Sequence, residues 1–137
     1  MIPYWQQKIV EAPFKDFYAT FYVDSARQEE DSIDASGFYY KDVKGPALKV
    51  ICIFCNESDF SGEVRLKLDW KKIGFESADK VQAENAVHSF DIRFKDVTKD
   101  DFEYVSNPAE TALIENGELK FPITGWNYRM IVLQKKE

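Results

Sequence analysis

Two cysteines at the spacing C-x-x-C are the first residues of the chain that could do chemistry, as a redox pair or as half of a zinc site. Cys52 and Cys55 stand in the apolar run VICIFCN. In an extended strand, residues three apart lie about 10 Å from each other and point to opposite faces, whereas a disulfide needs Cα atoms closer than about 7 Å. A zinc site would need two more ligands, and the chain has one histidine, His88. The spacing therefore predicts two buried or half-buried structural residues, with no metal and no cofactor.

The single histidine has no partner that the sequence can identify. His88 precedes Phe90 and Ile92 at the alternation of a strand, and no serine–histidine–acid or cysteine–histidine arrangement follows from the spacing. The six glycines are scattered singly, which is unlike a phosphate-binding loop. We therefore interpret His88 as a structural or exposed residue and assign no catalytic residue.

Carboxylates are numerous, and the densest run is Gln28 to Asp34 (QEEDSID). Glycoside hydrolysis needs two carboxylates held about 5 to 9.5 Å apart, a geometry that sequence does not supply for any pair among 24 acids. The run also lacks the ordered ligand spacing of an EF-hand. We interpret it as a solvated loop. The alternative is that the carboxylates of the 29–34 loop serve a free-standing small ligand-binding protein or enzyme.

Exposed aromatic residues are the remaining candidates for binding. Flat aromatic rings offer apolar area with a polar rim and stack on sugar rings. The carbohydrate-contact candidates are Trp126, Tyr128, Tyr39 and Tyr40. The competing interpretation is that such residues fill the core, which we favour for Trp70 because it shares a strand face with Leu66 and Leu68.

The elements that must position these side chains are predicted by alternation with a period of two. Residues 63–70 (EVRLKLDW) place apolar side chains on one face and charged ones on the other, as in a strand with one solvated face. Phe17–Val23 and Ala47–Cys55 are apolar on both faces, which predicts strands with something packed on each side. Asn116-Gly117 is the dipeptide preferred by a type I′ hairpin.

The fold class predicted is all-β, an antiparallel β-sandwich of about seven or eight strands with little or no helix. Helical spacing is weak, and a short turn is expected around Lys71–Phe75 or Thr98–Phe102. Pro122 interrupts its run and predicts that this strand lies at an edge or ends there. Residues 1–137 have the length of one domain.

Charge and hydropathy exclude several partners. The net charge is −6 and no stretch of five basic residues occurs, so we expect no nucleic-acid and no anionic-membrane partner. No apolar run approaches the 18 residues of a membrane span, and the first residues, MIPYWQQK, lack the features of a signal peptide. We expect either a cytosolic protein or a piece of a longer one; the location would be secreted or periplasmic if the parent carries a signal peptide.

Three segments together carry a resemblance to a known family. They are Ile2-Pro3-Tyr4-Trp5, the pair of strands in Leu48–Asn56 and Val64–Phe75 (VRLKLDWKKIGF), and Gly117–Ile123 leading to Tyr128–Leu133 (YRMIVL). This order resembles the C-terminal β-sandwich domain attached to (β/α)₈-barrel glycoside hydrolases and to their uncharacterised bacterial relatives. In that family an aromatic lead-in precedes a strand that ends in Asn, and the Asp and Gly of a "v-x-l-x-l-D-w-x-x-l-G" segment shape a turn.

The resemblance implies a non-catalytic accessory domain of a glycan-processing protein, forming the C-terminal portion of a longer chain. It would pack on an upstream catalytic domain in the same polypeptide and would contact saccharide. No catalytic residue is carried over, because the catalytic acids of such enzymes lie in the barrel. The chain departs from the family pattern in two segments, Gln28–Asp34 and residues 83–109. Both are longer and more acidic than the corresponding segments of the simplest members of the family.

Overall fold

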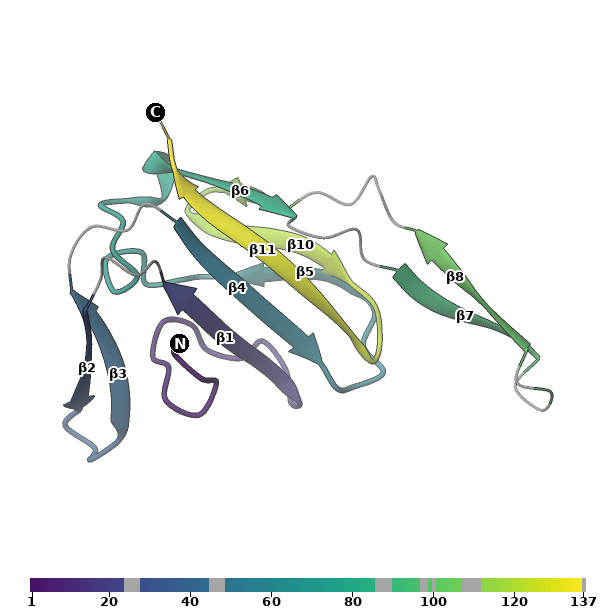
Figure 1. The fold of residues 1–137 in the computed structure, drawn as a ribbon, viewed down its shortest axis with the longest axis horizontal. Coiled ribbons are helices and arrows are strands. Elements are labelled where there is room, and N and C mark those ends of the chain that lie inside the picture. The colour runs from purple at the N-terminus through teal and green to yellow at the C-terminus, as the bar shows by residue number, and fades with distance from the viewer. Residues whose placement is uncertain are drawn as a thin grey trace.

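Two antiparallel sheets packed face to face form the body of the molecule (Figure 1). The computed structural model describes residues 1–23, 28–44, 49–85, 90–96, 99, 101–106 and 112–136. The first sheet has four strands in the order β1 (Phe17–Val23), β4 (Lys49–Asn56), β11 (Asn127–Lys135) and β6 (Val81–Asn85). The second sheet has three strands in the order β5 (Gly62–Leu66), β10 (Glu118–Ile123) and β9 (Leu113–Glu115).

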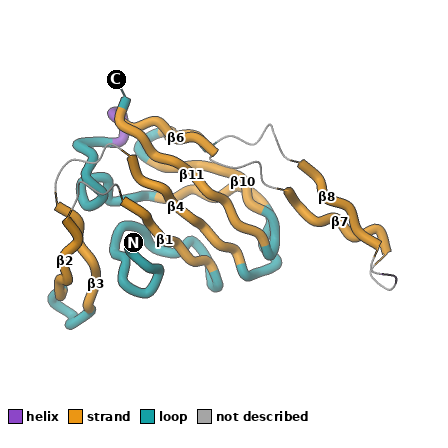
Figure 2. The backbone as a smooth tube through the Cα atoms, viewed as in Figure 1, coloured by secondary structure: helices purple, strands orange, loops and turns teal. Residues whose placement is uncertain are grey.

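Two separate hairpins complete the described strands. One consists of β2 (Gln28–Ile33) and β3 (Tyr39–Lys44), and the other of β7 (Phe90–Asp96) and β8 (Asp101–Ser106). The helix drawn in Figure 2 is a short 3₁₀ turn, η1 (Ala78–Lys80). The prediction of an antiparallel all-β sandwich is confirmed. The seven strands of the two packed sheets match the expected number, and the hairpins raise the described total to eleven.

The described part of the chain contains no helix of the length and hydropathy that a membrane crossing requires.

The core lies between the two sheets and is built by alternate residues of each strand. In β4, Val50, Cys52 and Phe54 are all fully buried, and their neighbours point the other way. The ring of Phe54 stacks on the ring of Phe121 in the opposite sheet, with 5.0 Å between centroids. Aromatic pairs at this separation add to the free energy gained by burial. The apolar alternation of the sequence thus supplies the packing that joins the sheets.

The predicted turns that fall on described residues are present. Asn116 and Gly117 have φ angles of 53° and 80° and join β9 to β10, as a type I′ turn requires. In the predicted turn after residue 70, the Asp69 carboxylate accepts the N–H of Lys72 at 3.2 Å, and Gly74 has a φ of 97°. His88 lies outside the described residues, as do Thr98 and Asp100 of the turn predicted around Thr98–Phe102.

One local prediction is wrong: the acidic segment forms strand β2 rather than a loop, because it pairs with β3 and places Asp31 opposite Lys41. For Pro122 the sequence predicts a strand that lies at an edge or ends there. Strand β10 pairs with both β5 and β9 and so is central, but it ends at Ile123, directly after the proline. Pro122 is tolerated there because the pairing with β9 extends only from Glu118 to Lys120. At Pro122 itself, β5 is the one strand among the described residues that pairs with β10.

Candidate functional site

The two cysteines lie on opposite faces of β4, as the sequence predicts. Cys52 is fully buried in the core, and Cys55 is half-buried on the other side of the sheet; both are free thiols. Burial raises the pKa of both thiols, and at Cys55 the nearby Glu57 carboxylate raises it further. Among the described residues no group of three histidine, cysteine or acidic side chains could hold a metal ion. Because the two thiols point to opposite faces of one strand, they are not placed to form a disulfide with each other.

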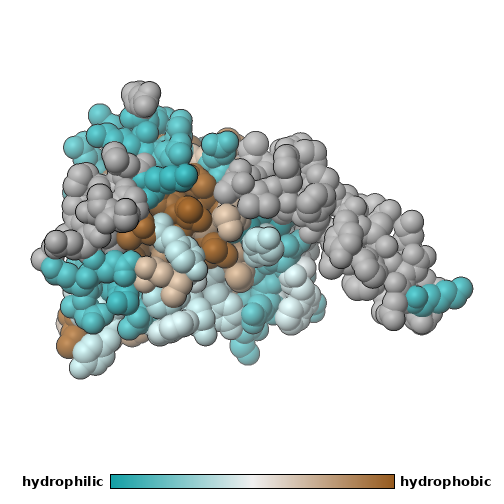
Figure 3. All heavy atoms as spheres, viewed as in Figure 1, coloured by the Kyte–Doolittle hydropathy of each residue, from teal (hydrophilic) through white to brown (hydrophobic). Residues whose placement is uncertain are grey.

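The outer face of the four-stranded sheet is apolar although no other described sheet covers it. We call this surface the outer sheet face. The register sets Ile51 beside Tyr22 and Val132, Ile53 beside Thr20 and Met130, and Cys55 beside Tyr18 and Tyr128. Figure 3 shows apolar side chains gathered over the middle of this sheet. An antiparallel sheet with one solvated face normally alternates apolar and polar residues, so this face is unusual.

Aromatic side chains of the N-terminal segment extend the outer sheet face past strand β1. The ring of Tyr4 lies 4.8 Å from that of Tyr18 and 4.9 Å from that of Trp5. Ile2 anchors this segment, because its backbone N–H and C=O both pair with Phe21 and its side chain is fully buried. The opposite margin is polar, with Gln82 and Gln134 in hydrogen-bond contact at 3.3 Å. An apolar centre with a polar rim is the usual anatomy of a protein interface.

Trp126 is the most exposed of the predicted carbohydrate-contact residues, with 70% of its surface accessible. It sits in the β10–β11 turn at a φ of 57°, a conformation uncommon for a bulky residue. Its indole N–H donates to the Asp59 carboxylate at 2.9 Å, and its backbone N–H donates to the Ser58 carbonyl at 3.1 Å. The ring is thus held in an exposed position.

Asn56 supports this turn from inside the molecule. Its side chain is 1% exposed and donates to the carbonyls of Phe60 and Thr124, at 2.8 and 3.0 Å. Its amide oxygen accepts from the backbone N–H and the hydroxyl of Ser58, at 3.0 and 2.6 Å. The β4–β5 loop and the β10–β11 turn are therefore joined through one fully satisfied buried amide. Asn56 is the asparagine at the end of the strand to which the resemblance points, and in the structure it connects this loop and this turn.

The four predicted aromatic contacts do not form one site. Trp126 and Tyr128 belong to the β10–β11 turn and the start of β11, while Tyr39 and Tyr40 belong to β3 in a separate hairpin (Figure 1). Tyr39 is exposed, and the ring of Tyr40 lies beneath two ammonium groups, 5.7 Å from that of Lys8 and 4.9 Å from that of Lys72. Tyr40 therefore orients lysine side chains and offers less free ring face than the sequence suggests.

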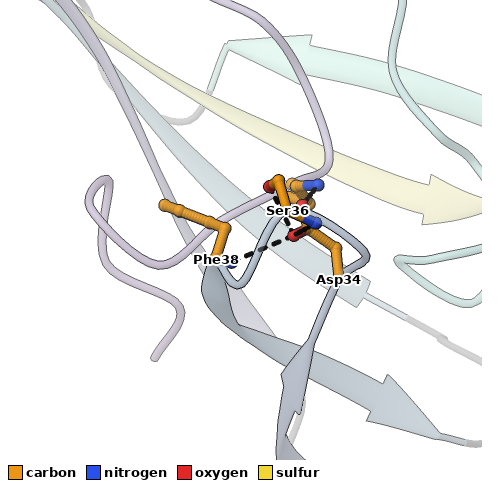
Figure 4. A network of polar contacts seen from close by, with 4 residues as sticks. Asp34, Ser36 and Phe38 are labelled. Carbon is orange, nitrogen blue, oxygen red and sulfur yellow. Dashed lines mark hydrogen bonds and ion pairs between the residues drawn. The ribbon is translucent and has the colours of Figure 1, made fainter.

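The acidic segment uses its carboxylates to bind the chain itself. Glu29 pairs with the N-terminal amino group, and Asp31 lies 3.5 Å from Lys41. Asp34 caps the β2–β3 turn: one carboxylate oxygen accepts from the backbone and hydroxyl of Ser36 and from the backbone of Phe38, and the other contacts Lys8 (Figure 4). Asp34-Ala35-Ser36-Gly37 is a sequence signal for this turn.

A groove of about 1010 Å³ opens beside the Asp34 turn. We call it the hairpin groove; it is formed by residues 7–11, by the β2–β3 turn at 34–38, and by residues 67–72 and 76–78. Its lining combines the rings of Phe38 and Trp70 with several lysine side chains. The sequence gives no direct sign of it, because its walls come from three distant segments.

Comparison of the chain with protein-family models, with curated proteins and with solved structures finds no match.

Proposed function

We propose that the chain is a non-catalytic accessory β-sandwich that docks on a larger protein through its outer sheet face. The observation that carries the proposal is the row of Ile51, Ile53 and Met130, which are half-buried on the outer side of the central strands and are bordered by the exposed rings of Tyr22 and Tyr128. Exposed apolar patches of this kind mark interaction sites in soluble proteins. Tyr, Trp and Met, which border or occupy this face, are the residues enriched in interfaces.

The partner in this proposal is a catalytic domain of the same polypeptide, as the resemblance to glycoside-hydrolase accessory domains implies. One feature of the described residues agrees with the proposal: the described acids of the 29–34 segment are engaged in pairs and turns.

Saccharide contact is the second part of the proposal, and Trp126 is its favoured residue. One hydrogen bond from the indole N–H and one from the backbone N–H of Trp126 hold the exposed ring, so that little conformational entropy is lost when a ligand stacks on it. Tyr128 follows on the adjoining strand and is 47% exposed. Tyr39 remains a candidate on the β2–β3 hairpin.

The docking proposal is tested with the polypeptide segment that adjoins this chain in the natural gene. That segment is produced separately, and its affinity for the 137-residue chain is measured by calorimetry. Ile53→Lys places a charge in the middle of the outer sheet face and is expected to weaken binding at least about tenfold, as loss of an interface anchor does. Leu113→Lys, on the exposed side of the other sheet, is the matched control.

Unchanged affinity of the Ile53→Lys protein would contradict the proposal, provided that its unfolding curve matches the wild type. An equal loss of affinity in the Leu113→Lys protein would also contradict it, because the loss would then follow from the added charge and not from its position on the outer sheet face. A natural gene that encodes no adjoining segment would exclude the accessory role altogether.

A further inference from the structure

Three aromatic side chains meet at the margin of the outer sheet face, beside strand β1. The rings of Tyr4 and Trp5 stand nearly perpendicular, at 88° with 4.9 Å between centroids, and the ring of Tyr18 lies 4.8 Å from that of Tyr4. We call these three residues the aromatic corner. Tyr4 is 48% and Trp5 58% exposed. The faces of such rings carry partial negative charge and attract cations.

Two carboxylates adjoin the aromatic corner. Asp16 comes directly before β1 and Glu57 directly after β4, so the pairing of these strands brings the two residues together. The backbone N–H of Glu57 donates to the carbonyl of Asp16 at 2.8 Å. The hydroxyl of Tyr18 donates to the Asp16 carboxylate at 3.4 Å, which connects the acids to the rings. Like charges at opposing positions of neighbouring strands are destabilising, and a cation between them would remove that cost.

The charge at the aromatic corner is negative. Neither Asp16 nor Glu57 has an ion pair recorded with a residue of the described ranges, and Lys15, which adjoins Asp16 in the chain, has none either. Partial burial raises the pKa of Tyr18, and the carboxylates of Asp16 and Glu57 raise it further. The corner therefore combines ring faces with carboxylates that have no recorded counter-charge among the described residues.

A pocket of about 110 Å³ opens beside two of the three rings. Its lining includes Tyr4, Tyr18 and Ala19, and the described residues that line it carry no charge. Phe21 uses its N–H and C=O to pair with Ile2 at the edge of β1, so Ala19, two residues earlier, directs its own N–H and C=O to the same edge. The Ala19 carbonyl is thus an acceptor at the pocket for the N–H of a ligand.

We propose that the aromatic corner binds an arginine side chain of the docking partner, with the guanidinium group against the rings of Tyr4 and Trp5 and its charge facing Asp16 and Glu57. The inference rests on the docking proposal and names the chemistry of the partner at one margin of the interface. Arginine suits this place because its planar group stacks on aromatic rings and pairs with carboxylates. It is also one of the residues that contribute most to binding at protein interfaces.

The test uses a probe that does not require the partner. The 137-residue chain is titrated with acetyl-arginine amide and with acetyl-citrulline amide, which has a similar shape and no charge, and the indole N–H signals are followed by NMR. Millimolar acetyl-arginine amide is expected to shift the Trp5 signal at least about threefold more than acetyl-citrulline amide, and less as salt rises. The Trp70 indole, whose N–H donates to the Gly117 carbonyl, is the internal reference and should not shift.

The double variant Asp16→Asn/Glu57→Gln keeps the shape of both side chains and is expected to remove the preference for the arginine probe. Tyr4→Leu removes the middle ring and is expected to reduce the shift severalfold. The matched control is Glu115→Gln/Glu118→Gln, which removes the same charge from the β9–β10 hairpin of the other sheet and should respond as the wild type does.

Equal shifts with the two probes, no shift of the Trp5 signal, or an equal loss in both double variants would each overturn the inference. So would an unchanged affinity of the Asp16→Asn/Glu57→Gln protein for the adjoining segment in the docking assay. The Ile53→Lys protein is expected to keep its response to the arginine probe. Failure of the docking proposal, seen in that assay, is thereby distinguished from failure of the cation site, seen in the titration.

Discussion

At the scale of single residues, the direction in which a side chain points decides what it can do. Cys52 and Cys55 are three positions apart, and the pleat of β4 turns one thiol into the core and the other toward the outer sheet face. The same alternation sends Phe54 to the core and Ile53 outward. These orientations follow from the period of a strand and were predictable from the sequence.

The cysteines provide a prediction at this scale. Labelling of the native chain with a thiol reagent is expected to modify Cys55 alone, and Cys52 only after unfolding, because Cys52 is fully buried. Burial and the Glu57 carboxylate raise the pKa of Cys55. A raised thiol pKa lowers the thiolate fraction at neutral pH, so Cys55 should react more slowly than a small free thiol, and the difference should narrow as pH rises.

Mass spectrometry of the labelled chain identifies the modified residue. Reaction of Cys52 at the rate of Cys55 in the native protein would contradict the assignment of its side chain to the core. A Cys55 rate equal to that of a small free thiol at neutral pH would contradict the raised pKa.

At the scale of elements, hydrogen bonds between the loops at the strand ends connect the two sheets. Asn56 ends β4 and binds both the β4–β5 loop and the β10–β11 turn, so one amide joins segments far apart in the chain. Gly125 lies at the same joint, where an added Cβ would come within 3.1 Å of the Ser58 carbonyl oxygen. The positions of Trp126 and of the strand ends depend on this close approach.

Asn56→Ala is expected to lower the free energy of unfolding by about 3 kcal/mol, because it leaves buried backbone groups without their partners. Urea unfolding of the two proteins measures the difference. Ser61→Ala is the control: its exposed hydroxyl accepts one N–H, that of Gly125, at the same joint, and its loss should cost about 0.5 kcal/mol. Equal effects of the two substitutions would refute the role given to the buried amide.

Elements specified by their own residues were predictable, and elements that depend on a partner strand were not. Asn116-Gly117 specifies its hairpin locally, and the structure has that turn. The segment Gln28 to Ile33 reads as a polar loop until it pairs with β3, and the central place of β10 depends on β5, more than fifty residues earlier. Local propensity contains no information about such partners.

At the scale of the whole molecule, the two sheets are used differently. The three-stranded sheet buries Leu119, Phe121 and Ile123 against the core and turns charged residues such as Lys120 to solvent. The four-stranded sheet is apolar on both faces in β4, one of its two central strands. The sequence indicated such a strand at Ala47–Cys55 but did not place Ile53 and Met130 side by side, because that contact depends on the pairing of β4 with β11.

The measurement that tests this account most directly is hydroxyl-radical footprinting of the isolated chain and of the same chain within its natural polypeptide. If the outer sheet face docks on an adjoining domain, oxidation of Met130 and Tyr22 is expected to fall severalfold in the longer protein, while oxidation of Leu113 on the other sheet stays the same. Equal oxidation of Met130 in the two proteins would contradict the account, because its side chain would then be as open to solvent in the natural polypeptide as in the isolated chain.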